Sequence, residues 1–192
     1  PNGAGKTTTL RMISGLLAAD SGEIRVFDVD ARADPIAAKQ LIAWLPDEPL
    51  LYDKLTAWEY LEFVAGLWGV DAKSAAAQAE DLLKLLGLWD NRNDRCDTFS
   101  RGMKQKAVLA GALIHDPTLL MLDEPLTGLD AGASRLVKDL IRTKVTDGAA
   151  VILTLTATLS GVSLDYQLSS GDGSVHLEAS VNQDDETQAT LT

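Results

Sequence analysis

The sequence predicts an α/β fold with a mostly parallel sheet. Short apolar stretches of strand length alternate with longer stretches of helical periodicity, which is the pattern of strand–helix–strand units. The chain has 192 residues, of which 46% are hydrophobic, and this is enough to bury the core that such a sheet needs. Three helical stretches in a row between residues 56 and 114 interrupt the alternation, so we expect a helical lobe inserted into the fold.

The first part of the chain predicts a helix, a strand, a short helix and a second strand. A helix is expected over residues 5–17, because this segment leaves a glycine-rich loop and begins with threonines. Residues 23–27 alternate polar and apolar side chains after an Asp-Ser-Gly turn, as a strand does. A short helix over 35–40 and an apolar strand over 41–45 follow, and Pro46 ends that strand.

The remaining elements are the helical lobe and the last strands. Thr56 and Glu59 have the spacing of a capping box and begin a helix expected over 56–68. An amphipathic helix over 72–86 ends at Gly87. The pattern is completed by a helix over 102–114, an apolar strand over 118–122, a helix over 133–144 and a β-rich run over 149–155.

Net charge and cysteine content exclude several classes of protein. Lys and Arg number 17 and Asp and Glu number 28, and the formal charge of −11 argues against non-specific nucleic-acid binding. A single Cys cannot build a disulfide framework or a Cys-based zinc site, and it suits a reducing compartment. No apolar run approaches the roughly 18–20 residues that span a bilayer.

The composition changes towards the C-terminus. Residues 145–192 carry seven acidic residues and no Lys or Arg, and Ser and Thr are dense after residue 157. This region is either an acidic, polar terminal tail or a different unit, or it is not authentic coding sequence. We therefore divide the chain into a first unit over residues 1–155 and an acidic, Ser/Thr-rich tail over 156–192.

The chain opens with the later part of a phosphate-binding loop of the form G-x-x-x-x-G-K-[ST]. Gly3 and Gly5 let the backbone amides close around phosphate oxygens, and the following helix N-terminus adds partial positive charge. Lys6 adds a full charge, and the Thr7 hydroxyl can ligate Mg²⁺, a hard cation that prefers oxygen. The expected nucleotide-binding residues are Asn2, Gly3, Ala4, Gly5, Lys6, Thr7 and Thr8. The alternative is a plain glycine-rich turn before a helix.

Two acids follow the apolar strand over 118–122. A buried strand would deliver Asp123 to the phosphate edge of the sheet, where its carboxylate can hold the water shell of Mg²⁺. Glu124 would then face the γ-phosphate and could act as a general base on a water molecule. The alternative is an acidic turn after a strand.

Three further motifs resemble those of the ATP-binding-cassette, or ABC, ATPase family. Residues 99–106 (FSRGMKQK) are similar to the family signature, written LSGGQ and followed by basic-Gln-basic. Residues 126–130 (LTGLD) resemble the D-loop, and residues 45–49 (LPDEP) occupy the Q-loop position. The order and spacing of these motifs over about residues 1–155 resemble the ATPase subunits of ABC transporters, most of all bacterial exporters of the bacitracin and multidrug type.

The resemblance implies a P-loop NTPase fold and a mechanism in which two cassettes enclose two ATP molecules head to tail. Ser100 and Gly102 of one chain would cap the γ-phosphate held by Lys6 and Thr7 of the other, and Asp130 would join the two sites. The implied cofactors are ATP and Mg²⁺. The residues implied around the metal are Thr7, Asp47 and Asp123, and the implied catalytic base is Glu124.

The resemblance also implies partners and a location. The partners would be a transmembrane permease subunit and a second ABC ATPase domain, identical or different, and no nucleic acid. The chain would lie at the cytoplasmic face of the cell membrane as a peripheral subunit that powers transport. The resemblance to exporters implies that this transport is export. Residues 47–64 would border the groove for the permease. The alternative for Trp58, Tyr60 and Phe63 in this stretch is that they are plain core aromatics.

The chain departs from the family pattern at several positions. Asp47 stands where the Q-loop has Gln, and its carboxylate can still approach Mg²⁺ or its water. Arg101 replaces the first signature Gly, and Met103 replaces the signature Gln. The family's H-loop His would fall at Thr156 or Ala157, so we expect weak hydrolysis. The family's strands before the phosphate loop are expected to be missing.

Two other functions stay open. The first is a soluble ABC ATPase of DNA repair or translation. Coiled-coil repair members have a far longer insertion before the signature, and zinc-bearing members need more than one Cys, whereas translation members carry two cassettes. The second is a non-catalytic fragment that neither binds nor hydrolyses ATP.

His115 precedes the acid pair and is expected to pack or cap rather than to catalyse.

Overall fold

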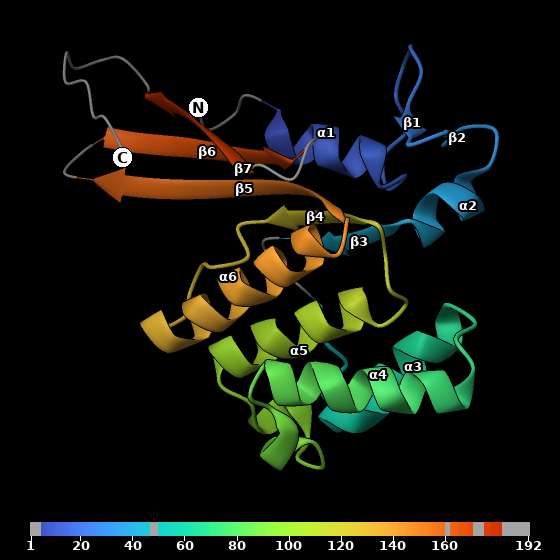
Figure 1. The fold of residues 1–192 in the computed structure, drawn as a ribbon, viewed down its shortest axis with the longest axis vertical. Helices are drawn as coiled ribbons and strands as arrows, with labels where there is room; N and C mark the ends of the chain where they lie inside the picture. Colours follow the sequence, from blue (N-terminus) through green and yellow to red (C-terminus); the bar gives the residue numbers. More distant parts are fainter. Residues whose placement is uncertain (1–4, 47–49, 160–161, 171–174, 182–192) are drawn as a thin grey trace.

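Up to residue 159 the helices and strands follow the order that the sequence predicts, except that one predicted strand is divided into two (Figure 1). The structure is a computed structural model that describes residues 5–46, 50–159, 162–170 and 175–181. The helices are α1 (Lys6–Ile13), α2 (Pro35–Gln40), α3 (Ala57–Leu67), α4 (Ala72–Leu85), α5 (Arg101–Leu113) and α6 (Ala131–Thr146), with 3₁₀ turns η1 (Trp89–Asn91) and η2 (Cys96–Thr98). The strands are β1 (Arg25–Val26), β2 (Val29–Asp30), β3 (Ile42–Leu45), β4 (Leu119–Asp123), β5 (Ala150–Leu159), β6 (Val162–Ser170) and β7 (Val175–Val181).

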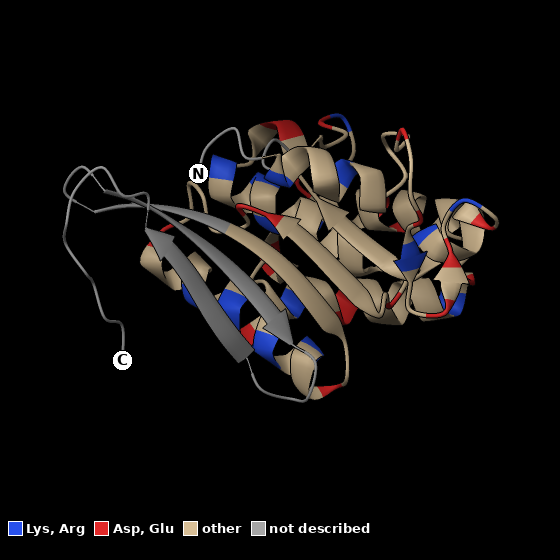
Figure 2. Cartoon of the chain, turned by 90° about the horizontal axis from the view of Figure 1, so that it is seen from above, with Lys and Arg blue, Asp and Glu red and all other residues tan. Residues whose placement is uncertain are grey.

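A five-stranded sheet in the order β3-β4-β5-β6-β7 forms the centre. β3, β4 and β5 are parallel, with Leu45 opposite Leu122 and Asp123 opposite Thr154. Every residue of β4 is buried, because helices cover both faces of the sheet, as is usual for parallel strands. The three predicted apolar strands are thereby confirmed. Charged residues lie mainly on helices and loops, and β3 and β4 together carry only Asp123 (Figure 2).

The alternation of side chains along β4 separates two hydrophobic clusters. Leu119 and Met121 belong to the cluster that contains residues of α1 and α2. Leu120 and Leu122 belong to the larger cluster that contains residues of α3 to α6. The molecule therefore has α1 and α2 on one side of the sheet and the other helices on the opposite side (Figure 1). Asp123 continues the odd-numbered series, so its carboxylate lies on the α1 side.

The helical lobe expected over residues 56–114 is built from α3, α4 and α5. Its first helix begins with the predicted capping box. Thr56 Oγ1 accepts the N–H of Glu59 at 3.1 Å, and Glu59 Oε2 accepts the N–H of Thr56 at 2.8 Å. The bonds from Thr56 hold the pKa of the Glu59 carboxyl below its usual value.

None of the described helices is long and apolar enough to cross a membrane.

Tyr60 of α3 packs directly on Gly111 of α5. Tyr60 is buried, and burial raises the pKa of its hydroxyl to about 12. A Cβ atom at Gly111 would lie 2.6 Å from the Tyr60 hydroxyl and 2.7 Å from the nearest ring carbon. A glycine at this position therefore allows the two helices to approach as closely as they do.

Two local features differ from the prediction. The sequence predicts one strand over 23–27, whereas the structure has the two short antiparallel strands β1 and β2. The chain turns between them at Phe27, which adopts a φ of 51°. The helix predicted over 5–17 ends at Ile13, because Gly15 adopts a φ of 69° and ends the helical path.

The sheet continues past residue 155. β5 extends to Leu159, and β6 and β7 pair antiparallel beside it. Residues that composition assigns to a tail therefore form two of the five strands of this sheet. The parallel part of the sheet carries the candidate site, and the antiparallel part extends the sheet on the side of β5.

Candidate functional site

The glycine-rich turn before α1 places two candidate phosphate-binding side chains. Gly5 precedes the helix with a φ of 87°, a left-handed conformation that other residues rarely adopt. Lys6 and Thr7 are the first two helical residues, where backbone N–H groups have no partner within the helix and can bind an anion. Thr8 follows them and is exposed. The predicted residues Asn2, Gly3 and Ala4 lie outside the described residues.

The Thr7 hydroxyl meets the Asp123 carboxylate at the end of β4. Thr7 Oγ1 donates to Asp123 Oδ2 at 3.0 Å, although the two residues are 116 positions apart. Asp123 is only 4% exposed, and its second oxygen, Oδ1, accepts the hydroxyl proton of Thr154 on β5. The structure thus brings together two of the three residues predicted around the metal.

This pair of side chains fits Mg²⁺ by its chemistry. Hydroxyl and carboxylate oxygens are the ligands that Mg²⁺ prefers, and the ion usually takes only one or two carboxylates together with waters and phosphate oxygens. In the part of the chain that the structure describes, no group of three or more His, Cys, Asp or Glu side chains could hold a metal ion without such additional ligands. Asp47, the third predicted residue, lies outside the described residues.

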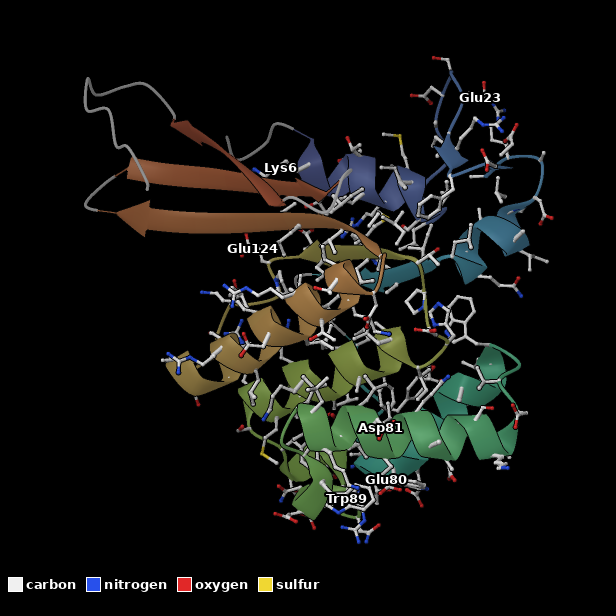
Figure 3. All side chains as sticks on the ribbon, viewed as in Figure 1. Lys6, Glu23, Glu80, Asp81, Trp89 and Glu124 are labelled. Atoms are coloured by element: carbon white, nitrogen blue, oxygen red, sulfur yellow. The ribbon has the colours of Figure 1, made fainter. Side chains whose placement is uncertain are left out.

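Glu124 lies at the same end of the sheet as Lys6 (Figure 3). Its φ of 49° is left-handed, which is uncommon for a residue with a side chain. The Glu124 N–H donates to the carbonyl oxygen of Thr154 at 3.1 Å, and the Glu124 carboxylate accepts the hydroxyl proton of Thr127 at 3.0 Å. Strained residues of this kind cluster at functional sites, where their surroundings hold them in place.

Ser100, Gly102 and Asp130 form a second group, at the beginnings of α5 and α6. Ser100 Oγ accepts an N–H of the first turn of α5 at 3.3 Å, and the Asp130 carboxylate accepts an N–H of the first turn of α6 at 2.7 Å. Both residues therefore cap helices. Gly102 faces the loop that precedes α6, where a Cβ atom would lie 3.5 Å from a methyl group of Leu129.

Gly128, in the loop between β4 and α6, is expected to tolerate no side chain without loss of stability. It has a φ of 75°, and a Cβ atom there would lie 2.8 Å from Nε of Arg101. The left-handed backbone alone predicts that Gly128→Ala lowers the free energy of unfolding by about 1–2 kcal/mol. Urea unfolding of the variant measures this change.

A matched control is Gly66→Ala in α3. A Cβ atom at Gly66 meets no atom within 4 Å, and this glycine has an ordinary helical backbone. The substitution should therefore leave stability unchanged or raise it by up to about 1 kcal/mol. Equal effects of the two alanine substitutions would contradict the explanation given for Gly128.

Sequence reasoning misses two residues that contact the acid pair. Thr154 reaches Asp123 through the register of β4 and β5, which a single sequence does not determine. Thr127 lies three residues after Glu124 in a turn, and Thr hydroxyls commonly bond to nearby groups in turns. That spacing is the one signal that could have found it.

His115 is half-buried and packs against its neighbours, as predicted. Its ring stacks on Trp68 with the ring centroids 4.1 Å apart, and its Nε2 lies 3.2 Å from the carbonyl oxygen of Ile42. Burial lowers the pKa of the imidazole, which favours its neutral form. Thr156 and Ala157, the expected H-loop positions, lie in β5.

The fold and the site define a class of protein. A glycine turn leads into a helix with Lys and Thr at its start, and a buried parallel strand brings an Asp to that Thr. This is the α/β fold of a P-loop NTPase. The model of the family described as "ABC transporter" matches residues 1–127. The chain belongs to the ABC transporter family, in the class of its ATP-binding subunits.

Individual relatives agree with this assignment. The ABC transporter ATP-binding protein NatA of Bacillus subtilis (strain 168) is 44% identical over 142 residues, which are 73% of this chain and 58% of NatA. The SkfA peptide export ATP-binding protein SkfE of the same organism is 36% identical over 172 residues, 90% of this chain and 69% of SkfE. A solved ATP-binding subunit of an ABC transporter has a TM-score of 0.73 and 31% identity, covering 80% of this chain and 64% of that one. The chain thus spans little more than half the length of NatA.

Proposed function

We propose that the chain binds Mg-ATP beside the Thr7–Asp123 pair and hydrolyses it. The observation that carries this proposal is the 3.0 Å hydrogen bond between the helix after the glycine turn and the acid that ends a buried strand. The bond places a hydroxyl, a carboxylate and a helix N-terminus that begins with a lysine in one neighbourhood. A nucleotide triphosphate with a hard divalent cation matches this combination of groups. Residues 1–155 would form the nucleotide-binding unit.

Each residue would have a distinct role. Lys6 would neutralise charge on the β- and γ-phosphates, while Thr7 and Asp123 would hold Mg²⁺, which supplies further charge neutralisation when bound. Glu124 would accept a proton from the attacking water, and the Thr127 hydroxyl would orient its carboxylate. The second group, Ser100, Gly102 and Asp130, would face the nucleotide of a second cassette, and Asp47 would approach the metal from the Q-loop position.

A cavity beside the helical lobe supports the proposal of a permease partner. It has a volume of about 750 Å³ and lies where α1 and β3 meet α3 and α5. Trp44, Val64 and Trp68 contribute apolar surface to it, and Leu50 on its border is 91% exposed. Tyr60 also lines it but is a core residue at 5% exposure. We propose that the permease docks here, at the cytoplasmic face of the membrane, and that transport is export, as in the name of SkfE.

Thermal unfolding with and without Mg-ATP tests the proposal. Nucleotide at about 100 times its dissociation constant adds roughly 2.7 kcal/mol to the free energy of unfolding. For a chain of this size, that corresponds to a rise in Tm of roughly 5–11 °C. The rise should disappear in Lys6→Ala, and phosphate release should disappear with it.

The matched control is Lys73→Ala, which removes an exposed lysine from α4. Its Tm should rise with Mg-ATP as much as that of the unaltered chain. A cooperative melt of the unaltered chain without any rise in Tm would contradict nucleotide binding and would favour a non-catalytic fragment. A rise that Lys6→Ala retains would place the nucleotide elsewhere.

A further inference from the structure

Thr154 contacts both residues of the acid pair, although it lies on a different strand. The parallel register of β4 and β5 sets Thr154 directly opposite Asp123. The Thr154 hydroxyl donates to Asp123 Oδ1 and lies 3.2 Å from the backbone nitrogen of Glu124, which donates to it. The carbonyl oxygen of Thr154 accepts the same N–H at 3.1 Å. One residue thus holds the side chain of the first acid and the backbone of the second.

The side chains that precede Thr154 on the same face of β5 are apolar. Thr154 is 4% exposed, and Ala150 and Ile152, which alternate onto the same face of β5, pack against the cluster that contains residues of α1 and α2. A buried hydroxyl is unfavourable unless it is hydrogen-bonded, and a β-branched hydrocarbon side chain would satisfy the strand equally well. The Thr154 hydroxyl therefore makes its hydrogen bonds to the acid pair, and the strand itself does not need this hydroxyl.

Each carboxylate oxygen of Asp123 accepts a hydrogen bond from one hydroxyl group. Thr7 donates to Oδ2 and Thr154 donates to Oδ1, so the plane of the carboxylate is fixed from both sides. Thr7 begins the helix after the glycine turn and would itself touch the cation. Thr154 hydrogen-bonds the other carboxylate oxygen from the neighbouring strand and would act through Asp123 and Glu124, without touching the cation itself.

We propose that Thr154 is a positioning residue for Mg²⁺, which fixes the orientation of the Asp123 carboxylate and the backbone of Glu124. This inference rests on the proposed function of the same site. Groups that hydrogen-bond a metal ligand from behind orient it, and their loss typically weakens metal binding or activity by about 10–100-fold. Thr154→Val, which keeps the shape and removes the hydroxyl, should therefore weaken the response to Mg²⁺ specifically.

The experiment measures the binding of the fluorescent analogue mant-ATP while MgCl₂ is titrated from EDTA-buffered conditions. We expect the Mg²⁺ concentration at half-maximal enhancement of binding to rise by about 10–100-fold in Thr154→Val. Binding of mant-ATP in EDTA should stay within about threefold of the unaltered chain, because the contacts of Lys6 and the loop amides remain. Thr154→Ser keeps the hydroxyl and should restore a Mg²⁺ dependence close to that of the unaltered chain.

Thr118→Val is the matched control, since Thr118 is exposed and immediately precedes the other end of β4. It should leave the Mg²⁺ dependence unchanged. Should Thr154→Val lose its cooperative melt, Thr154→Cys, which keeps a weak donor, takes its place with an expected shift between those of Ser and Val. An unchanged Mg²⁺ dependence in Thr154→Val, or in Thr154→Cys where that variant takes its place, would overturn the inference while leaving nucleotide binding intact. Failure of the unaltered chain to bind mant-ATP under any condition would overturn the proposed function and this inference together.

Discussion

Glu124→Gln is expected to lower kcat for ATP hydrolysis by about 10²–10⁴-fold, the range that a positioned general base contributes. An amide cannot accept the proton of the attacking water. The glutamine oxygen can still accept the hydroxyl proton of Thr127, and the backbone bond from residue 124 to Thr154 does not involve the side chain. The variant should therefore keep its fold and its rise in Tm with Mg-ATP. Phosphate release at saturating Mg-ATP measures the change.

The control for this substitution is Glu62→Gln, which removes an exposed carboxylate from α3. Its kcat should match that of the unaltered chain. A kcat of Glu124→Gln within about threefold of the unaltered value would mean that another group activates the water. A loss of the Mg-ATP-induced rise in Tm would mean that Glu124 contributes to binding rather than to hydrolysis.

Gly111→Val is expected to destabilise the fold strongly. The added Cβ atom would lie within 3 Å of three atoms of the buried Tyr60 side chain, and the branched methyl groups need further space. Overpacking of a core costs typically about 1–3 kcal/mol, so we expect a loss of about 3 kcal/mol at this contact. For a chain of this size, Tm should fall by roughly 6–12 °C in a thermal melt.

Two further variants test whether the loss of stability comes from the contact with Tyr60 or from placing a valine in a helix. Gly66→Val introduces the same side chain into α3 at a position where an added Cβ atom would meet nothing within 4 Å beyond the helix's own backbone, and it should change stability little. Tyr60→Ala opens the space opposite residue 111, so adding it to Gly111→Val should destabilise by less than the sum of the two single changes. Additive effects would show that Tyr60 is not the group that excludes a side chain at residue 111.

The elements that carry strong local signals are predicted from the sequence. The capping box at Thr56 and the apolar runs before Pro46 and Asp123 each depend on neighbouring residues, and the structure has them where expected. Phe27 is different, since nothing about a phenylalanine indicates a left-handed turn, and one predicted strand becomes two.

The candidate site likewise contains residues that the sequence predicts and residues that it does not. The closeness of Thr7 and Asp123 follows from recognised motifs, because each motif implies the other. The participation of Thr154 depends on which residue of β5 lies opposite Asp123, and that register is set by packing across the whole sheet. Strands β6 and β7 are not predicted, since the change in composition before them indicates a tail. A polar, acidic segment gives little apolar pattern from which strand pairing could be predicted.

The side of the sheet that the Asp123 carboxylate faces depends on the alternation of side chains along β4. Residues 119 and 121 face one hydrophobic cluster and residues 120 and 122 face the other, and Asp123 takes its side from this count. A deletion or insertion of one apolar residue within β4 would leave the strand apolar and still exchange the sides that its side chains face. The carboxylate would then enter the larger cluster, away from Thr7. The hydrophobic residues of β4, which touch no ligand, thus determine on which side of the sheet a charge is found.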